Sequence, residues 1–289
     1  MPHKFNHCFY LLMMAWLLFA SSCSSRISTF GRVKIAKRSD SLRLKERIAT
    51  IKSIKNERFE KGLFKGTSDT TIVYRLFKPL NSRNQKLPLI VFFHGSNAVG
   101  TDNVSQLGIL AKLFAMDKTQ AKYPAYVLAP QFPSRSSNYS LDQQRNLLTS
   151  SPQPCLTVAL QLVDSLKTAL NIDQNRIYVV GFSMGASTAI NALALRPDLF
   201  AAGISVSGIP QFNQIAMLSK IPLWIIHGNA DTENPFASDE QFYKEVSHEH
   251  KIRFWEMDNL SHNDIFSTPF LGNELPNWLF KNTISKANN

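Results

Sequence analysis

A serine lies between two glycines in the stretch "GFSMG", a spacing that serine nucleophiles use. Ser183 stands at the centre, with Gly181 and Gly185 two residues to either side. A hydroxyl that attacks a carbonyl carbon must project from a sharp turn, and the crowded backbone of such a turn favours glycine on both sides. The pattern alone also fits a small-residue turn with a serine helix cap. Attack further requires a base, an acid that orients the base, and N–H donors for an oxyanion.

Two later stretches contain an acid and a histidine that could complete such a site. "IIHGNAD" places Asp231 just past an apolar run, and we expect its carboxylate to orient the histidine. Glu233 and Asp239 are nearby alternatives, and Asp231 could instead be a solvated turn residue. "LSHNDIF" contains His262, which is either the base or an ordinary turn residue. Our interpretation takes Asp231 as the acid and His262 as the base.

The stretch "LIVFFHGSN" supplies candidate oxyanion donors, because its glycine lets the backbone fold back toward Ser183. We expect the amides of Ser96 and Met184 to hold the oxyanion, and the loss of one such donor typically raises the barrier by ~3 kcal/mol. His94 is expected to brace this loop, with no catalytic role. Three further residues are expected to contact the substrate: Asn97, Gln131 and Phe182.

The elements that must position these residues follow from the pattern of apolar residues. The run from residue 176 to residue 180 is apolar on both faces, as in a buried parallel strand, and a helical pattern follows Met184 until Arg196-Pro197. Ser183 therefore lies on a strand-to-helix turn. Further strands are predicted at 71–77, 87–93, 126–129, 201–206, 223–226 and 252–256, and helices around 103–118, 155–170, 184–195, 237–248 and 274–285. This alternation predicts an α/β fold with a mostly parallel central sheet, helices on both faces, and functional residues at the carboxyl ends of the strands.

In the order of its motifs the sequence resembles the carboxylesterase and feruloyl-esterase-like branch of the α/β-hydrolases, which borders on polyhydroxybutyrate depolymerases and prolyl-oligopeptidase-type domains. The resemblance covers about residues 70–285, in the blocks "LPLIVFFHGSNAVGTDN", "KYPAYVLAPQFP", "IDQNRIYVVGFSMGAS", "RPDLFAAGISVSG", "IPLWIIHGNAD" and "LSHNDIF". It implies the α/β-hydrolase fold and a mechanism with Ser183 as nucleophile, His262 as base and Asp231 as acid. The family's "AGERG" loop is absent, and Ile265 replaces its usual tryptophan, so the substrate is less well defined than the triad.

The implied function is a serine esterase that forms an acyl-enzyme. A serine peptidase of the same fold and a non-catalytic envelope lipoprotein that binds a ligand are the alternatives. The polar stretch at residues 133–155 is expected to border the cleft, and it lacks the broad apolar face of a lipase lid. We therefore expect short or aromatic acyl esters, including carbohydrate-linked ones. No cofactor or metal is expected, because His248-Glu249-His250 fits a solvated helix end better than a ligand pair.

The first residues resemble a bacterial lipoprotein signal. A 12-residue apolar block ends in Ala20-Ser21-Ser22-Cys23, which predicts acylation of Cys23 and a lipid anchor in the bacterial cell envelope. A plain signal peptide cleaved nearby is the alternative. Of the other cysteines, Cys8 would leave with the signal and Cys155 is expected to be a buried structural thiol.

The positive charge of the chain is concentrated near its start. The net charge is +11, and residues 26–66 contain 13 Lys/Arg against 4 Asp/Glu. We expect this stretch, as a surface helix or a tether, to lie at the membrane surface and not to bind nucleic acid. The predicted organisation is a signal peptide at 1–22, a basic membrane-proximal segment at 23–66 and a catalytic domain at 67–289.

Overall fold

The computed structural model describes residues 31–36, 41–67, 69–80, 85–267 and 272–284. Cys23 and the predicted signal peptide lie outside the described residues. Within these ranges no helix has both the length and the apolar character that crossing a membrane requires.

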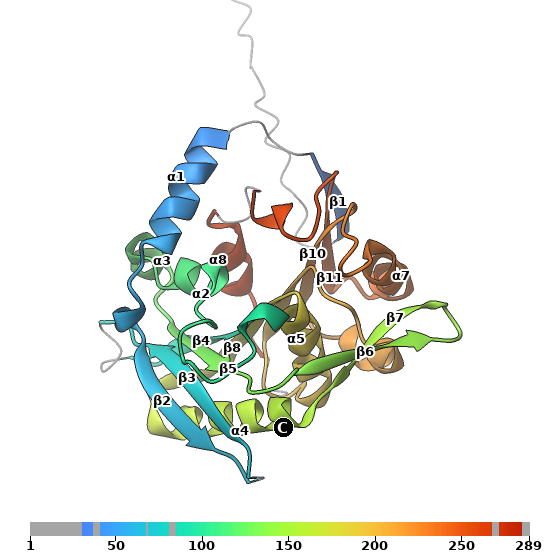
Figure 1. Ribbon diagram of the computed structural model, residues 1–289. Helices are drawn as coiled ribbons and strands as arrows, with labels where there is room; N and C mark the ends of the chain where they lie inside the picture. Colours follow the sequence, from blue (N-terminus) through green and yellow to red (C-terminus); the bar gives the residue numbers. More distant parts are fainter. Residues whose placement is uncertain (1–30, 37–40, 68, 81–84, 268–271, 285–289) are drawn as a thin grey trace, which may run out of the picture.

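A nine-stranded sheet runs through the molecule in the order β1-β11-β10-β9-β8-β4-β5-β3-β2 (Figure 1). β3 is antiparallel to both β2 and β5, and the other neighbouring strands are parallel. The predicted α/β fold with a mostly parallel sheet is therefore confirmed. The strands are β1 Gly31–Ile35, β2 Glu60–Lys65, β3 Thr71–Phe77, β4 Leu87–Phe93, β5 Tyr126–Gln131, β8 Ile172–Phe182, β9 Ala202–Val206, β10 Leu223–Gly228 and β11 Ile252–Met257.

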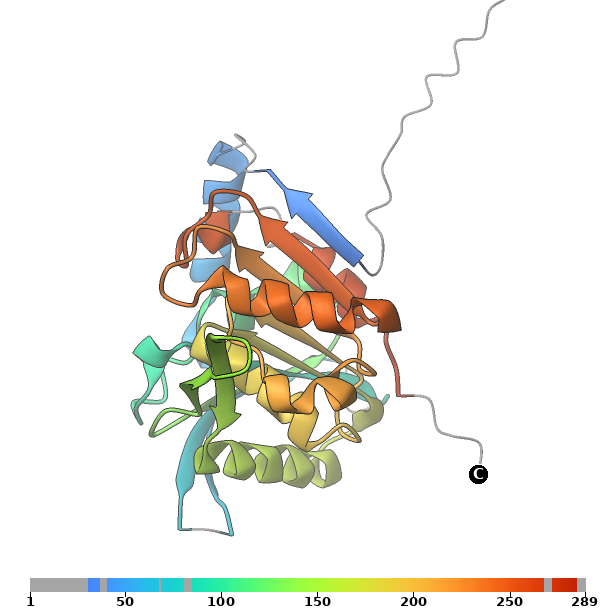
Figure 2. The same ribbon diagram turned by 90° about the vertical axis from the view of Figure 1, so that its right-hand side faces the viewer.

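Helices cover both faces of the sheet (Figure 2). One face carries α4 Pro154–Ala169, α5 Met184–Leu195, α6 Ile215–Leu218 and α7 Phe236–Val246. The other carries α1 Ser41–Lys52, α2 Ile109–Phe114, α3 Asp117–Lys122 and α8 Glu274–Leu279. Short 3-10 turns complete the chain: η1 Asn56–Arg58, η2 Ser96–Ala98, η3 Phe212–Gln214, η4 Ser247–Glu249 and η5 Asp264–Ser267.

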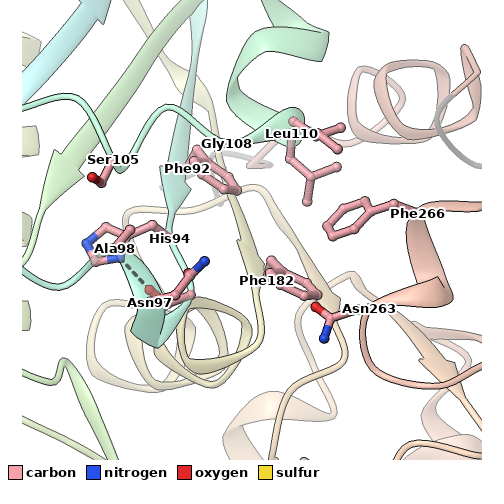
Figure 3. Close-up of a pocket in the computed structure, with 12 residues that line it drawn as sticks. Phe92, His94, Asn97, Ala98, Ser105, Gly108, Leu110, Phe182, Asn263 and Phe266 are labelled. Atoms are coloured by element: carbon pink, nitrogen blue, oxygen red, sulfur yellow. Dashed lines mark hydrogen bonds between the residues drawn. The ribbon is translucent and has the colours of Figure 1, made fainter. Parts of the chain in front are cut away.

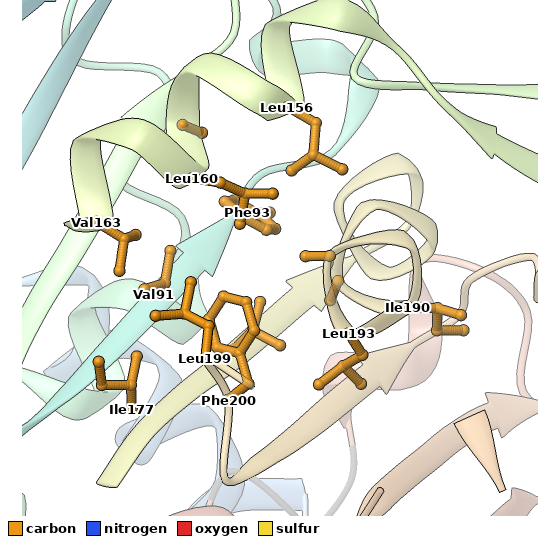
Figure 4. Close-up of a cluster of buried hydrophobic side chains, with 14 of the residues drawn as sticks. Val91, Phe93, Leu156, Leu160, Val163, Ile177, Ile190, Leu193, Leu199 and Phe200 are labelled. Carbon is orange, nitrogen blue, oxygen red and sulfur yellow. The ribbon is translucent and has the colours of Figure 1, made fainter. Parts of the chain in front are cut away.

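The central strands are apolar on both faces because helices bury both. β4 is buried at every position, and its Val91 and Phe93 meet Leu160 and Val163 of α4 on one side (Figure 4). Burying a side chain of this size contributes about 1.5–3 kcal/mol. The core therefore fixes the carboxyl ends of β4 and β8, where the candidate residues lie.

The N-terminal part of the fold differs from the expectation. β1 pairs with β11 and β2 forms a hairpin with β3, whereas α1 is a surface helix, one of the two expected alternatives. The domain boundary expected at residue 67 falls inside this hairpin. The positive charges are partly paired within the fold: Arg32 contacts Glu256 at 2.6 Å and Lys34 contacts Asp258 at 2.9 Å.

The polar stretch after β5 forms a hairpin of its own, β6 Ser137–Asp142 and β7 Leu147–Pro152. Buried polar contacts hold it on α5, including the bond from Asn191 Nδ2 to Ser137 Oγ at 2.7 Å. Tyr139 Oη also lies 3.1 Å from the hydroxyl of Ser187, one turn after Ser183. Much of this polarity therefore serves to dock the hairpin. The Cys155 thiol that follows is buried, as expected.

Candidate active site

The Ser183 turn joins β8 directly to α5. Ser183 has φ +56° and ψ −123°, a backbone conformation that few residues with a side chain adopt. A Cβ added to Gly181 would lie 2.0 Å from the carbonyl oxygen of Gly185, and one added to Gly185 would lie 2.1 Å from that of Phe93. Both glycines are thus required by close backbone approach, and the turn projects the hydroxyl above the carboxyl edge of the sheet.

One chain of hydrogen bonds links the three residues chosen from the sequence. The Nε2 atom of His262 lies 2.8 Å from Ser183 Oγ, and its Nδ1 atom lies 2.7 Å from Asp231 Oδ2. An ionised carboxylate can only accept, so Nδ1 carries the proton and Nε2 is left to accept the serine proton. Burial favours the neutral form of Asp231, but hydrogen bonds from His227, His262 and the Asn234 amide outweigh this effect and hold its pKa below the usual range.

Of the three candidate acids, Asp231 is the one whose carboxylate meets His262 Nδ1. Its Oδ1 atom accepts the backbone amides of Glu233 and Asn234, both at 2.9 Å, so Oδ2 is turned toward the imidazole. The side chain of Glu233 is 61% exposed, and its carboxylate is 3.9 Å from Nε2, the wrong nitrogen for an orienting acid. Asp239 contacts His227 instead.

The two amides expected to hold the oxyanion belong to segments that lie next to Ser183. A Cβ at Gly95 would lie 3.5 Å from the Cβ of Ser183, which places the loop that begins η2 directly beside the serine. Within the described residues, neither the Ser96 amide nor the Met184 amide has a hydrogen-bond acceptor. Both N–H groups can therefore serve an oxygen bound next to Ser183.

His94 and Gln131 brace the loop that carries Ser96. His94 Nε2 accepts the amide of Phe132 at 2.9 Å, Nδ1 donates to Gly95 O at 2.8 Å, and burial lowers its pKa to about 4. Gln131 was expected to contact the substrate, and in the structure it lies inside the fold. Its side chain is fully buried, and its amide bonds the backbone of Ala98 and Asn103.

A small cleft of about 210 Å³ lies beside the serine (Figure 3). The rings of Phe92, Phe182 and Phe266 and the side chain of Leu110 give it an apolar interior, while Asn97 and Asn263 supply polar groups. Two of the expected substrate contacts, Asn97 and Phe182, thus line it. None of its lining residues comes from the β6–β7 hairpin, which was expected to border the cleft.

The sequence interpretation missed residues contributed by other elements. Ile109 and Leu110 come from α2, outside the strand-end motifs. Phe266 comes from η5 and ends the stretch "LSHNDIF", in which only His262 had been given a role. His227 lies in β10, in the same motif as Asp231, and contacts Asp239 of α7. In the part of the chain that the structure describes, no three His, Cys, Asp or Glu side chains are grouped as a metal site would require.

Comparison with known proteins finds esterases. A family model described as "Putative esterase" matches residues 67–266. The "Putative esterase NocK" of Nocardia uniformis subsp. tsuyamanensis is 31% identical over 103 residues, which are 35% of this chain and 30% of that protein. The "Bifunctional acetylxylan esterase/xylanase XynS20E" of Neocallimastix patriciarum is 31% identical over 84 residues, 29% of this chain and 12% of that protein.

Among solved structures, one described as a thermostable esterase superposes with a TM-score of 0.71 at 29% identity. The match covers 79% of this chain and 64% of that chain. The chain therefore spans less than a third of the two curated relatives and about two thirds of this structure.

Proposed function

Since the chain belongs to this esterase family, we propose that it is a carboxylic ester hydrolase in which Ser183 is the nucleophile, His262 the base and Asp231 the orienting acid. The observation that supports the proposal most directly is the unbroken hydrogen-bond chain from Ser183 Oγ through His262 to Asp231. The proposal is tested by hydrolysis of p-nitrophenyl esters and by covalent labelling of Ser183 with a fluorophosphonate probe. A chain that binds esters without hydrolysing them would contradict it.

The mechanism follows from these contacts. His262 Nε2 takes the proton of Ser183 as Oγ attacks the ester carbonyl, and the amides of Ser96 and Met184 receive the oxyanion. Collapse of the tetrahedral intermediate expels the alcohol, which takes the proton back from His262. Water activated by His262 then hydrolyses the acyl-enzyme, and Asp231 stabilises the imidazolium in both halves.

The proposed substrates are esters of short or aromatic acyl groups, including carbohydrate esters. An apolar cavity of about 150 Å³ holds benzene, whereas pockets for drug-sized ligands span roughly 300–1,000 Å³. A cleft of about 210 Å³ lined by Phe92, Phe182 and Phe266 therefore suits one ring or a short chain. The acetylxylan esterase named above supports a carbohydrate alcohol as the leaving group.

We expect kcat/KM for p-nitrophenyl acetate to exceed that for the dodecanoate by at least about tenfold, or ~1.4 kcal/mol of differential transition-state binding. Ile109→Ala, which widens the cleft, should move the ratio toward the longer ester. Ile48→Ala is the control, because Ile48 packs on the same core but does not line the cleft. A preference of the native chain for the long ester, with activation at a lipid interface, would contradict the proposal.

We also propose that Cys23 is acylated and anchors the protein in a bacterial envelope, because a 12-residue apolar block ends in Ala-Ser-Ser-Cys. Cys23→Ala is expected to abolish incorporation of labelled palmitate and to release the protein from the membrane fraction. Cys8→Ala is the matched control and should leave labelling unchanged, since Cys8 would be removed with the signal. Palmitate labelling that survives Cys23→Ala rules out this anchor.

A further inference from the structure

We propose that His227 is a positioning residue for ester hydrolysis, because its Nε2–H group holds the Asp231 carboxylate in the orientation that His262 requires. The inference rests on the proposed function of the Ser183 site. His227 does not reach the substrate; it acts through Asp231.

The geometry places His227 between two carboxylates. Its side chain is fully buried at the end of β10. Nδ1 lies 2.7 Å from Oδ2 of Asp239 on α7. Nε2 lies 3.0 Å from the carbonyl oxygen of Asn234 and 3.2 Å from Oδ2 of Asp231. A continuous row of side chains therefore runs from Asp239 through His227 and Asp231 to His262 and Ser183.

The proton positions on His227 follow from these partners. The carbonyl oxygen of Asn234 can only accept, so Nε2 must carry a hydrogen. One further proton lies between Nδ1 and Asp239, and wherever it rests the two side chains together carry no net charge. Burial opposes a charged ring, but the carboxylates of Asp231 and Asp239 raise the pKa of His227 to about 9. Burial also raises the pKa of Asp239, in keeping with a shared proton.

His227 completes the set of donors on Asp231. Two backbone amides hold Oδ1, and His262 Nδ1 donates to Oδ2. The Nε2–H group of His227 lies 3.2 Å from the same Oδ2 while it donates to the carbonyl oxygen of Asn234. Without the His227 donor, Oδ2 would keep only His262. The carboxylate would then lose one donor that shares its negative charge, and its plane would be less firmly fixed.

Other polar and titratable groups surround this row. Glu233 lies 3.9 Å from His262 Nε2 but is largely exposed. Tyr139 on β6 approaches Asn234, and burial raises the pKa of its phenol, so it stays neutral near pH 7. Phe236 places its ring edge-on to the His227 imidazole, with 5.7 Å between centroids. Within the described residues, His227 and His262 are therefore the two imidazoles in contact with the Asp231 carboxylate.

Two substitutions distinguish the contact of Nδ1 with Asp239 from the contact of Nε2 with Asp231. The amide of His227→Asn reaches the Nδ1 position and can meet only Asp239, whereas the amide of His227→Gln reaches the Nε2 position and can still donate to Asp231. We expect His227→Asn to lower kcat roughly tenfold or more with little change in KM, since a hydrogen bond to a charged group is lost. The acid limb of its kcat/KM profile should move to higher pH. His227→Gln should retain most of the activity and the native acid limb.

A purely structural role for His227 predicts a different result. Both variants would then lose the same activity, in proportion to unfolded protein measured by circular dichroism, with no movement of the acid limb. Equal kcat values and equal acid limbs in the two variants would overturn the proposal.

A measurement on the native chain keeps the proposal testable if both variants fail to fold. In protein labelled with ¹⁵N-histidine, the Nε2 atom of His227 should be protonated throughout the pH range in which the chain is folded. Its N–H resonance should shift in Asp231→Asn. An unprotonated Nε2, or a resonance that Asp231→Asn leaves unmoved, would overturn the proposal. This NMR measurement needs no substrate, so its result does not depend on whether the chain hydrolyses esters. A failure of ester hydrolysis would count against the proposed function alone.

Discussion

Replacing Ser183 by alanine is expected to lower kcat by about 10⁶-fold, the loss that follows removal of a triad serine in a comparable system. Without Oγ no acyl-enzyme can form, and only the amides of Ser96 and Met184 remain to stabilise an oxyanion. The fold should persist, because within the described residues the Ser183 hydroxyl has a single hydrogen-bond partner, His262. Alanine carries the same Cβ as serine, so it meets the same backbone constraint at φ +56°.

The measurement combines steady-state hydrolysis of p-nitrophenyl acetate with fluorophosphonate labelling read by mass spectrometry. Ser165→Ala is the control, since Ser165 is exposed on α4 and takes no part in the hydrogen-bond chain. Thermal unfolding should differ little between the native chain and either variant. Labelling that persists in Ser183→Ala, or hydrolysis near the native rate, would assign the nucleophile to another residue.

Asp231→Asn is expected to lower kcat by about 10⁴-fold, because the imidazole would be held in the wrong tautomer. Two backbone amides occupy the Oδ1 position, so the asparagine oxygen stays there and its NH₂ group takes the Oδ2 position. That group donates toward His262 Nδ1, which must then give up its proton. The proton moves to Nε2, which can no longer accept from Ser183.

Glu233→Gln is the matched control for the acid, and we expect it to change kcat little. It removes one carboxylate from the same loop, but that carboxylate is exposed and lies 3.9 Å from the imidazole. Circular dichroism should show that Asp231→Asn remains folded. If Asp231→Asn hydrolyses p-nitrophenyl acetate normally while Glu233→Gln is inactive, the acid has been assigned to the wrong residue.

The central sheet could be predicted because its strands are buried on both faces and read as continuous apolar runs. β4 and β10 are buried at every position, and their observed bounds begin where the apolar runs begin. β1 and β2 were missed because they lie at the edges of the sheet. In β1 charged and apolar residues alternate, as Arg32-Val33-Lys34-Ile35, and this period-two pattern was the available signal amid the surrounding basic residues.

The candidate site could be predicted as far as strand ends determine it. Ser183, Asp231 and His262 follow β8, β10 and β11, and parallel strands bring these ends to one edge of the sheet. Gln131 also ends a strand, but its side chain points into the fold and bonds the loop after β4. A strand-end motif does not show which way a side chain points. His227 was missed for a similar reason, since its role depends on Asp239 across the packing of α7.

The pairing of β1 with β11 also bears on how separate molecules meet in solution. All six residues of β11 are buried, and β1 pairs with its outer edge. Without β1, that edge would present unpaired backbone groups beside apolar side chains. Sheets of different molecules join through edges of this kind. β1 replaces that edge with one carrying Arg32 and Lys34, whose charges disfavour such joining. A chain that lost Gly31–Ile35 would keep Ser183, Asp231 and His262, yet it would be prone to aggregate through its uncovered edge. The outermost strand thus protects the solubility of the protein. This property is separate from the chemistry at the carboxyl ends of β8, β10 and β11.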